Sequence, residues 1–439
     1  MIPRIGAAFL VCALFLGLAT MGGVQTAEVY HTEGTVSSSL PTMGNTRYDM
    51  VVIAPDGFSG ALQPFIEHKN SYNVATILIS TEDIYSDYEG RDEAEQIKYC
   101  IKDALDTWNI KYVLLVGDPE TIPMRNSAVQ CSWYTFEYVP TDLYYADIYD
   151  ENMSFCSWDS NDNDMFGEYT WDMSHDRTEY IDMVDLYPDV GVGRLPCSSS
   201  SEVDTMVDKV ITYETQTYGQ DWFHRILLMG GDTHSQHEGN EGEIVTDYVA
   251  NVMTDFEPVR LWTSTQSFRP LRINRAISDG VGFVSYSGHG NEYKISTFIP
   301  GTERAVRYYT PYIWGLKNNE RLPIVFLDCC LTGNLEFHVF NVKIPCFAWA
   351  LVKKPSGGAI AAIGASRMGY GGLVGDPLGG GTCRMNANFF EAYEPGITVS
   401  DMFMKAQCAY LDALWKDCFT LEEFNLIGDP SLKIGGYPA

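Results

Sequence analysis

Basic residues are scarce in this 439-residue chain, where 29 Lys and Arg stand against 58 Asp and Glu and the formal net charge is −29 at pH 7. A protein that binds nucleic acid needs a basic face, so this charge excludes nucleic acid as a partner. It favours solubility and the attraction of basic substrates. The sequence shows no internal repeat, and its glycine clusters lack the strand–helix context that cradles phosphates, so repeat proteins and P-loop enzymes are excluded.

Long apolar runs are confined to the N-terminus. Arg4 gives a positive start, residues 5–21 are almost wholly apolar, and small residues follow, which is the pattern of an export signal. We expect residues 1–27 to be removed, leaving a secreted or cell-surface protein with no membrane span. A retained anchor is the alternative, because about 17 apolar residues approach the length of a span. The polar residues 28–46 are expected to form a flexible or propeptide-like lead.

The rest of the chain has the composition of a globular protein, with 45% hydrophobic and 13% aromatic residues overall. Strand-like runs alternate with helical patterns, which predicts an α/β fold with mostly parallel sheets. One set of strands is expected at residues 48–54, 75–79 and 112–116. A second set begins at residue 226 and includes 258–262, 283–287, 322–328 and 358–363. Helices are expected at 92–108 and 201–215, and the second of them links the two sets.

A histidine and a cysteine follow two of these strands. The run at residues 283–290 ends in His289 and Gly290, and the run at 322–331 carries the pair Cys329 and Cys330. In open α/β sheets ligands bind at the carboxyl ends of the strands, so a thiol nucleophile and its proton-handling partner would be exposed there. The backbone amides of Gly290 and Cys330 are candidates for an oxyanion hole. A buried cysteine that only packs is the alternative reading of such a run.

These residues resemble the gingipain-type cysteine peptidases, which belong to the caspase-like clan. The likeness covers roughly residues 47–435 and rests on an ordered series of motifs, at 112–118, 187–194, 322–326, 330–333, 344–348, 358–363 and 428–432. It implies two adjacent three-layer α/β subdomains, an N-terminal one at 47–215 and a caspase-like catalytic one at 216–439, with chemistry only in the second. It implies Cys330 as nucleophile, whereas Cys329 departs from the small residue common in the family.

The resemblance also suggests a third catalytic residue and a substrate pocket. Asp232 matches the acid that orients the histidine in the family; Asp189 is the second choice, and a turn or N-cap aspartate is the alternative for either. Glu241 or Glu243 lies near the family's acidic residue that selects a basic side chain. Acidic residues also favour a helix N-terminus, which would explain both without a substrate. Tyr370 is expected to wall the pocket.

The sequence contains candidate ligands for two metals. His234 and His237 lie three apart in a glycine-rich loop, which is not the helical His-Glu-x-x-His pattern of a zinc protease. Calcium is better supported, because the loop after Trp158 repeats oxygen side chains at every second position and ends in a glutamate. The expected ligands are Asp159, Asn161, Asn163 and Glu168. A solvated acidic loop would have a similar composition.

The sequence therefore predicts an exported cysteine endopeptidase that acts on protein or peptide substrates through a thioester, with a preference for basic residues, no cofactor for catalysis and a structural calcium ion. An inactive peptide- or surface-binding homologue and a transpeptidase stay open. Eleven cysteines allow disulfides such as Cys131–Cys156 or Cys408–Cys418 in an oxidising compartment, although connectivity cannot be read from sequence. The oligomeric state is not indicated.

Overall fold

The computed structural model describes residues 47–131, 137–172, 177–234, 239–371, 376–414 and 417–438. The predicted export signal at 1–27 and the lead at 28–46 lie outside these residues. In the part of the chain that is described, no helix is both long enough and apolar enough to span a bilayer.

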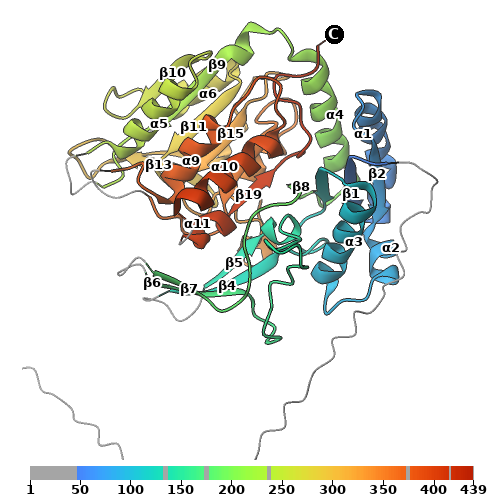
Figure 1. Ribbon diagram of the computed structural model, residues 1–439. Helices are drawn as coiled ribbons and strands as arrows, with labels where there is room; N and C mark the ends of the chain where they lie inside the picture. The colour runs from blue at the N-terminus through green and yellow to red at the C-terminus, as the bar shows by residue number, and fades with distance from the viewer. Residues whose placement is uncertain are drawn as a thin grey trace, which may run out of the picture. The chain divides into compact units, whose positions relative to one another are not determined.

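A ten-stranded sheet organises the fold (Figure 1). Its order is β10 (Glu257–Trp262), β9 (Arg225–Gly230), β11 (Phe283–Ser287), β15 (Ile324–Asp328), β18 (Ala361–Ala365), β19 (Phe424–Ile427), β8 (Gly191–Leu195), β3 (Tyr112–Val116), β1 (Met50–Ala54) and β2 (Thr76–Ser80). Every neighbouring pair is parallel except β18 with β19. The short, apolar and β-branched runs of the sequence become interior strands, as expected for a parallel sheet covered on both faces.

Helices cover this sheet. Those of the N-terminal part are α1 (Ser59–Ser71), α2 (Thr81–Asp87), α3 (Glu93–Trp108) and α4 (Ser200–Gln216); those of the C-terminal part are α5 (Glu241–Val252), α6 (Pro270–Ser278), α7 (Thr310–Ile313), α8 (Phe347–Val352), α9 (Gly381–Glu391), α10 (Val399–Leu414) and α11 (Cys418–Glu423). Short 3₁₀ helices are η1 (Asp56–Phe58), η2 (Leu143–Tyr145) and η3 (Asp221–His224). In Figure 1, α5, α9 and α10 lie in front of the C-terminal part of the sheet.

Three smaller sheets complete the described structure. The first contains β5 (Glu137–Thr141), β4 (Arg125–Cys131), β6 (Phe166–Asp172) and β7 (Arg177–Tyr180). The second contains β12 (His289–Asn291), β13 (Lys294–Phe298) and β14 (Ala305–Tyr309), and the third pairs β16 (His338–Val339) with β17 (Val342–Lys343). The second sheet begins at the predicted catalytic histidine and so belongs to the functional edge of the fold.

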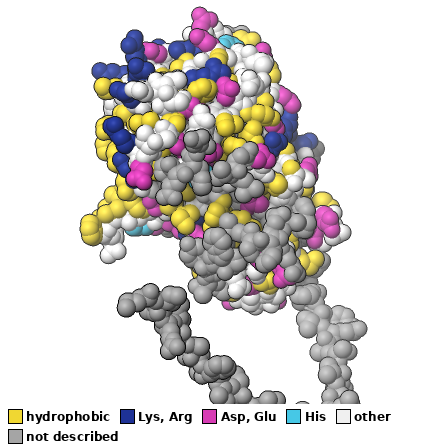
Figure 2. All heavy atoms as spheres, turned by 90° about the vertical axis from the view of Figure 1, so that its left-hand side faces the viewer, with side chains coloured by type: hydrophobic (Ala, Val, Ile, Leu, Met, Phe, Trp, Pro, Cys, Tyr) yellow, Lys and Arg dark blue, Asp and Glu magenta, His cyan; other side chains and the backbone are white. Residues whose placement is uncertain are grey.

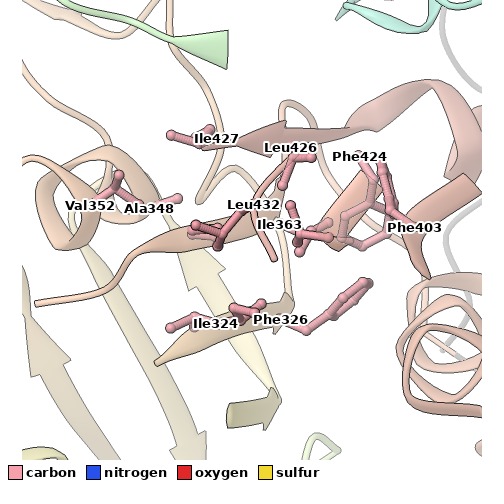
Figure 3. Packing of buried hydrophobic residues seen from close by; sticks show 14 of the residues in the cluster. Ile324, Phe326, Ala348, Val352, Ile363, Phe403, Phe424, Leu426, Ile427 and Leu432 are labelled. Carbon is pink, nitrogen blue, oxygen red and sulfur yellow. The ribbon is translucent and has the colours of Figure 1, made fainter. Parts of the chain in front are cut away.

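The main core lies between the sheet and its helices. Figure 3 shows Phe326 of β15, Ile363 of β18 and Phe424 of β19 converging with Phe403 of α10. The Phe326 and Phe424 ring centroids are 5.1 Å apart, and both side chains are buried. Burying such side chains contributes about 1.5–3 kcal/mol each, so this packing holds β15, which precedes Cys330, rigidly in place.

The two predicted sets of strands meet where β8 and β19 pair through Ile427 and Arg194. The guanidinium of Arg194 is fully buried and donates to both carboxylate oxygens of Asp142, at 2.6 and 2.7 Å. A Cβ at Gly193 would lie 2.5 Å from the carbonyl oxygen of Gly428, so the close approach of the two segments requires glycine. The sheet therefore runs across the predicted boundary between 47–215 and 216–439, and that division into subdomains stays a prediction.

Disulfides are not part of the described structure. Cys156, Cys408 and Cys418 are in no disulfide, so the hypothetical Cys408–Cys418 bridge is not formed. The two residues belong to different helices, and the Cys418 sulfur lies 2.7 Å from the hydroxyl of Tyr180. Cys156 is likewise in no disulfide, so the hypothetical Cys131–Cys156 bridge is not formed either; the side chain of Cys131 lies outside the described residues.

A buried ion cluster links α1, α4 and the C-terminal segment. Lys69 Nζ lies 2.8 Å from Glu214 and 2.6 Å from Asp429, and all three side chains are fully buried. His68 Nε2 lies 2.8 Å from the other oxygen of Glu214. Burial alone would lower the pKa of Lys69, but Asp429 and Glu214 outweigh it and raise that pKa, so the lysine stays charged.

Lys69→Met should therefore leave two buried carboxylates without a cation. We expect a loss of roughly 3–5 kcal/mol in the free energy of unfolding at neutral pH, measured by urea titration with tryptophan fluorescence. Lys405→Met is the matched control, because Lys405 and its partner Glu394 are 49% and 68% exposed and such pairs contribute under about 1 kcal/mol. Equal losses in the two variants would contradict a structural role for the buried cluster.

Candidate active site

Two neighbouring strands bring the predicted dyad to one edge of the sheet. β11 and β15 pair in parallel, with Ser287 opposite Asp328 at their last residues. His289 and Cys330 each follow two positions later, so both leave the sheet at the same level. A Cβ at Gly290 would lie 2.7 Å from the carbonyl oxygen of Cys330, which shows how closely the two segments approach. The structure thus places the histidine and cysteine segments side by side.

The thiol of Cys330 is held in a half-buried turn. Its Sγ donates to the carbonyl oxygen of Gly369 at 3.4 Å. The following residue, Leu331, has a φ of 58°, a left-handed conformation that is strained for leucine and common at functional turns. Burial, reinforced by the charge of Glu423, raises the pKa of the Cys330 thiol to about 11. The resting thiol is therefore protonated at neutral pH and needs a base to react.

The imidazole of His289 is exposed and oriented by a backbone carbonyl. Its Nε2 lies 2.9 Å from the carbonyl oxygen of Thr233, and its ring packs edge-on against Phe298 with the centroids 5.6 Å apart. A carbonyl oxygen can only accept, so this contact assigns the proton to Nε2 and leaves Nδ1 as the basic nitrogen. The carbonyl of Thr233 thus has the orienting function that a third catalytic residue would have.

Asp232, the predicted orienting acid, lies beside this contact but does not take part in it. Its carboxylate is fully buried; Oδ1 accepts from the amide of His234 at 2.8 Å, and Oδ2 has no hydrogen-bond partner among the described residues. Its backbone pairs with Phe298. Asp189, the second choice, accepts from two backbone amides in a turn. A catalytic role for the Asp232 carboxylate stays a prediction, and Thr233 supplies the contact observed.

Glu241 and Glu243 begin α5 and are both nearly buried. Glu241 Oε2 accepts from the amide and the hydroxyl of Thr233, each at 3.1 Å, and so steadies the residue whose carbonyl meets His289. Glu243 accepts from Ser264 through its amide at 2.9 Å and its hydroxyl at 2.6 Å, and from Asn240 at 3.1 Å. Neither carboxylate pairs with a cation in the described part of the chain. Their predicted role in binding substrate stays a prediction.

An aromatic wall stands next to the thiol. Tyr370 follows Gly369, and its ring contacts Trp171 and Phe419 at centroid distances of 5.1 and 5.5 Å. Trp171 belongs to β6, from the predicted N-terminal subdomain. Arg367, three residues before Tyr370, donates to the carbonyl oxygen of Tyr138 in β5 at 2.7 Å. The N-terminal part of the chain therefore helps to build the wall of the site, which the sequence interpretation had confined to the C-terminal part.

Glu423 was missed by the sequence interpretation. Its carboxyl group is fully buried, and neither oxygen has a hydrogen-bond partner among the described residues. A Cβ at Gly369 would lie 3.1 Å from its Oε1, so the carboxyl lies directly behind the segment that accepts from Cys330. Burial raises the pKa of Glu423 well above its usual range. Only its position before the strand at 424–427 was visible in the sequence.

The oxyanion role of the amides of Gly290 and Cys330 stays a prediction. The amide of Cys330 lies outside the strands and helices, and no backbone carbonyl of the described residues accepts from it. Gly290 belongs to β12 and lies opposite Ile295 of β13. The amide of Cys330 interacts with its own thiol, and this contact acts to lower the thiol pKa against the larger effect of burial.

The predicted calcium loop has a cation of its own. Asp159 is 2% exposed and pairs with Arg91, with 2.5 Å between Nη1 and Oδ2. It also accepts from two backbone amides of the loop, and the side-chain amide of Asn163 donates to Glu168 at 3.0 Å. Asn161 is exposed. Among the residues described, no three or more His, Cys, Asp or Glu side chains form a metal-binding group. Calcium binding stays a prediction and would require displacing Arg91.

The fold and the dyad define a class: an α/β protein with a thiol and an imidazole at the carboxyl ends of neighbouring parallel strands, as in cysteine peptidases of the caspase-like type. The sequence model of peptidase family C25 matches residues 44–435. The chain belongs to this family. The resemblance to gingipain-type cysteine peptidases and the mostly parallel α/β fold class are both confirmed.

Individual relatives are distant. Gingipain R2 of Porphyromonas gingivalis is 25% identical over 407 aligned positions, covering 88% of this chain and 46% of that protein. Lys-gingipain of the same organism is 25% identical over 192 positions, covering 43% of this chain and 10% of that protein. This chain thus spans about half the length of Gingipain R2.

Solved structures show the same fold. The complex of Porphyromonas gingivalis RgpB pro- and mature domains matches with a TM-score of 0.65 and 22% identity, covering 89% of this chain and 80% of that chain. The Arg-specific cysteine proteinase gingipain R matches with a TM-score of 0.65 and 23% identity, covering 88% and 78%. At these identities the similarity establishes the fold alone.

The raised pKa of Cys330 has a measurable consequence. Because the thiolate is the reactive form, alkylation of Cys330 by iodoacetamide should rise about tenfold per pH unit from pH 7 to 9, without levelling off. Glu423→Gln removes a carboxyl group whose ionised form raises the pKa of the thiol, so it should accelerate alkylation where Glu423 ionises, most strongly toward the alkaline end of the range. Peptide mass spectrometry follows Cys330 separately from other cysteines. Glu422→Gln, whose carboxylate accepts from Tyr169 at 3.1 Å, is the control and should react like the wild type; acceleration in it alone would contradict the assignment.

The calcium prediction has its own test. Binding at the loop should raise the Tm in millimolar Ca²⁺ relative to EGTA, because a ligand that binds only the folded state stabilises it. Asp159→Asn should abolish that difference. Identical melting of the wild type in Ca²⁺ and in EGTA would show that Arg91 alone satisfies the loop.

Proposed function

We propose that this protein is a cysteine endopeptidase that hydrolyses peptide bonds through a thioester on Cys330, with His289 as its proton carrier. The observation that carries the proposal is that His289 and Cys330 each follow, by two residues, the end of one of two paired parallel strands. The contact of Nε2 with the Thr233 carbonyl, which leaves Nδ1 of His289 basic, supports it. Membership of peptidase family C25 supports the same activity. Export through residues 1–27 remains part of the proposal.

The chemistry follows from the resting state. Nδ1 of His289 takes the proton from the Cys330 thiol as the sulfur attacks the peptide carbonyl carbon. The amides of Gly290 and Cys330 donate to the oxyanion that forms. The imidazolium then gives its proton to the leaving amine, the C–N bond breaks, and the acyl group remains as a thioester. A water molecule, deprotonated by His289, attacks the thioester and releases the acid and the thiol. No further group is required by these steps.

Substrate choice is proposed to favour a basic residue on the acyl side of the scissile bond. Glu243 is a buried carboxylate that neutral donors surround and that pairs with no cation among the described residues, so a guanidinium or ammonium of a substrate could meet it. It lies at the start of α5, where a Cβ on Gly242 would lie 2.3 Å from the carbonyl oxygen of Ser287, at the end of the His289 strand. The description of one matching structure as Arg-specific agrees with this choice.

The test uses fluorogenic peptides that end in Arg, Lys, Gln or Asp before the reporter group. Cys330→Ala and His289→Ala should each lower kcat/KM by at least about 10³-fold on every substrate, because both act in the same chemical unit. Equal turnover by the wild type and Cys330→Ala would refute the catalytic assignment. Products formed in the presence of an added amine distinguish hydrolysis from transpeptidation, and inert wild type with intact peptide binding would indicate a binding homologue.

Glu243→Gln separates specificity from catalysis. A hydrogen bond to a charged group contributes about 1.5–3 kcal/mol, so the variant should lose roughly 10–100-fold in kcat/KM on Arg and Lys substrates. Turnover of the Gln substrate should stay within about twofold of the wild type. Asp247→Asn, at an exposed ion pair on the same helix, is the matched control. A uniform loss on all substrates would assign Glu243 to structure alone.

A further inference from the structure

A cavity beside the candidate active site contains two arginines. Its volume is about 430 Å³, and its walls include Thr263, Phe268, Arg269, Thr302 and Arg304. We call it the arginine cavity. It lies between the segment that follows β10 and the loop that joins β13 to β14. The catalytic residues of the proposed mechanism do not line it.

The cavity is connected to the site through Phe298. The ring of Phe298 packs on His289, and its carbonyl oxygen accepts from the Thr263 hydroxyl at 2.7 Å. Thr263 follows the last residue of β10, and β9 alone separates β10 from β11, the strand that ends two residues before His289. Two strand spacings amount to roughly 10 Å. An extended peptide advances about 3.3 Å per residue, so a side chain some three residues from the scissile bond can reach the cavity.

In the part of the chain that is described, the two arginines of this cavity have no carboxylate partner. Acidic residues outnumber basic ones two to one, yet among the described residues no carboxylate pairs with Arg269 or Arg304. Within the described ranges, the guanidinium of Arg269 donates to the Gln266 side chain alone, at 3.4 Å, and both arginines are exposed. Nearby Arg260 pairs with Asp247, so ion pairing is available to this surface. Figure 2 shows several Lys and Arg side chains along one edge of the face drawn, with Asp and Glu side chains among them.

We propose that the arginine cavity is a substrate subsite that binds an acidic side chain, Asp or Glu, about three residues from the scissile bond. The proposal rests on the proposed peptidase function and extends its substrate class. Two guanidinium groups that share a cavity offer paired N–H donors of the kind that carboxylates bind in a bidentate manner. The preferred substrate therefore combines a basic residue at the bond that is cut with an acidic residue a short distance along the chain.

The experiment scans an internally quenched peptide that has one Arg at the cleavage position. Glu is placed in turn two, three and four residues to either side, with Gln at the same position as the neutral reference. For wild type we expect a Glu to Gln ratio in kcat/KM of at least about tenfold at one position. Arg269→Gln with Arg304→Gln should bring this ratio to about one, while turnover of the Gln peptides stays unchanged. Arg272→Gln, an exposed arginine of α6 outside the cavity, is the control and should keep the wild-type ratio.

A binding measurement separates this inference from the proposed function. Fluorescence anisotropy of the best Glu peptide with Cys330→Ala should show tighter binding than the Gln peptide, and the difference should vanish when both arginines are replaced. If the wild type cleaves nothing but this arginine-dependent binding is present, the peptidase proposal fails and the subsite stands. Three outcomes would overturn the subsite. They are no preference for Glu at any position, a preference that persists in the double variant, and binding of inorganic phosphate but of no Glu peptide.

Discussion

The parallel pairing of β11 with β15 is the constraint on which the site depends. Because strand side chains alternate between faces, a shift of one residue in this register would turn either His289 or Cys330 away from the other. Buried packing on β15 and the hydroxyl of Tyr286 prevent such a shift. That hydroxyl donates to the carbonyl oxygens of His289 and Ser296, both at 2.8 Å, and fastens the hairpin of β12 and β13 to the end of β11.

The surroundings of Cys330 keep its thiol protonated, so the reaction depends on His289 as the base. Buried carboxyl groups at Asp232, Glu241 and Glu423 surround the edge of the sheet, and none carries a positive partner among the described residues. With a pKa of about 11, deprotonation of the Cys330 thiol at neutral pH costs roughly 5 kcal/mol. Deprotonation therefore has to accompany attack, and the base and the oxyanion donors offset that cost together. The exact position of His289 consequently matters more than it would beside a preformed thiolate.

Much of this arrangement could be predicted from the sequence. The apolar runs at 48–54, 112–116 and 322–328 match β1, β3 and β15 closely, because parallel interior strands are short and apolar throughout. His289 and Cys330 were visible since each follows such a run. The contact of His289 with the carbonyl oxygen of Thr233 could not be predicted, because every residue type has a backbone carbonyl. Glu423 and the Arg91–Asp159 pair depend on contacts between distant segments, which periodicity does not report.

Charge pattern, not net charge, distinguishes the edge of the sheet beyond His289. The hydroxyl of Thr263 lies 3.4 Å from Glu243, and the same residue lines the arginine cavity, so charges of opposite sign stand on either side of it without pairing. Neutral donors hold Glu243, and Arg269 and Arg304 are exposed to solvent. Because the two sites do not pair with each other, each can bind a substrate group of opposite charge. A net charge of −29 would attract any basic chain equally. Separated charges fixed a few residues apart discriminate by order along a peptide, since the reversed order meets repulsion at both positions.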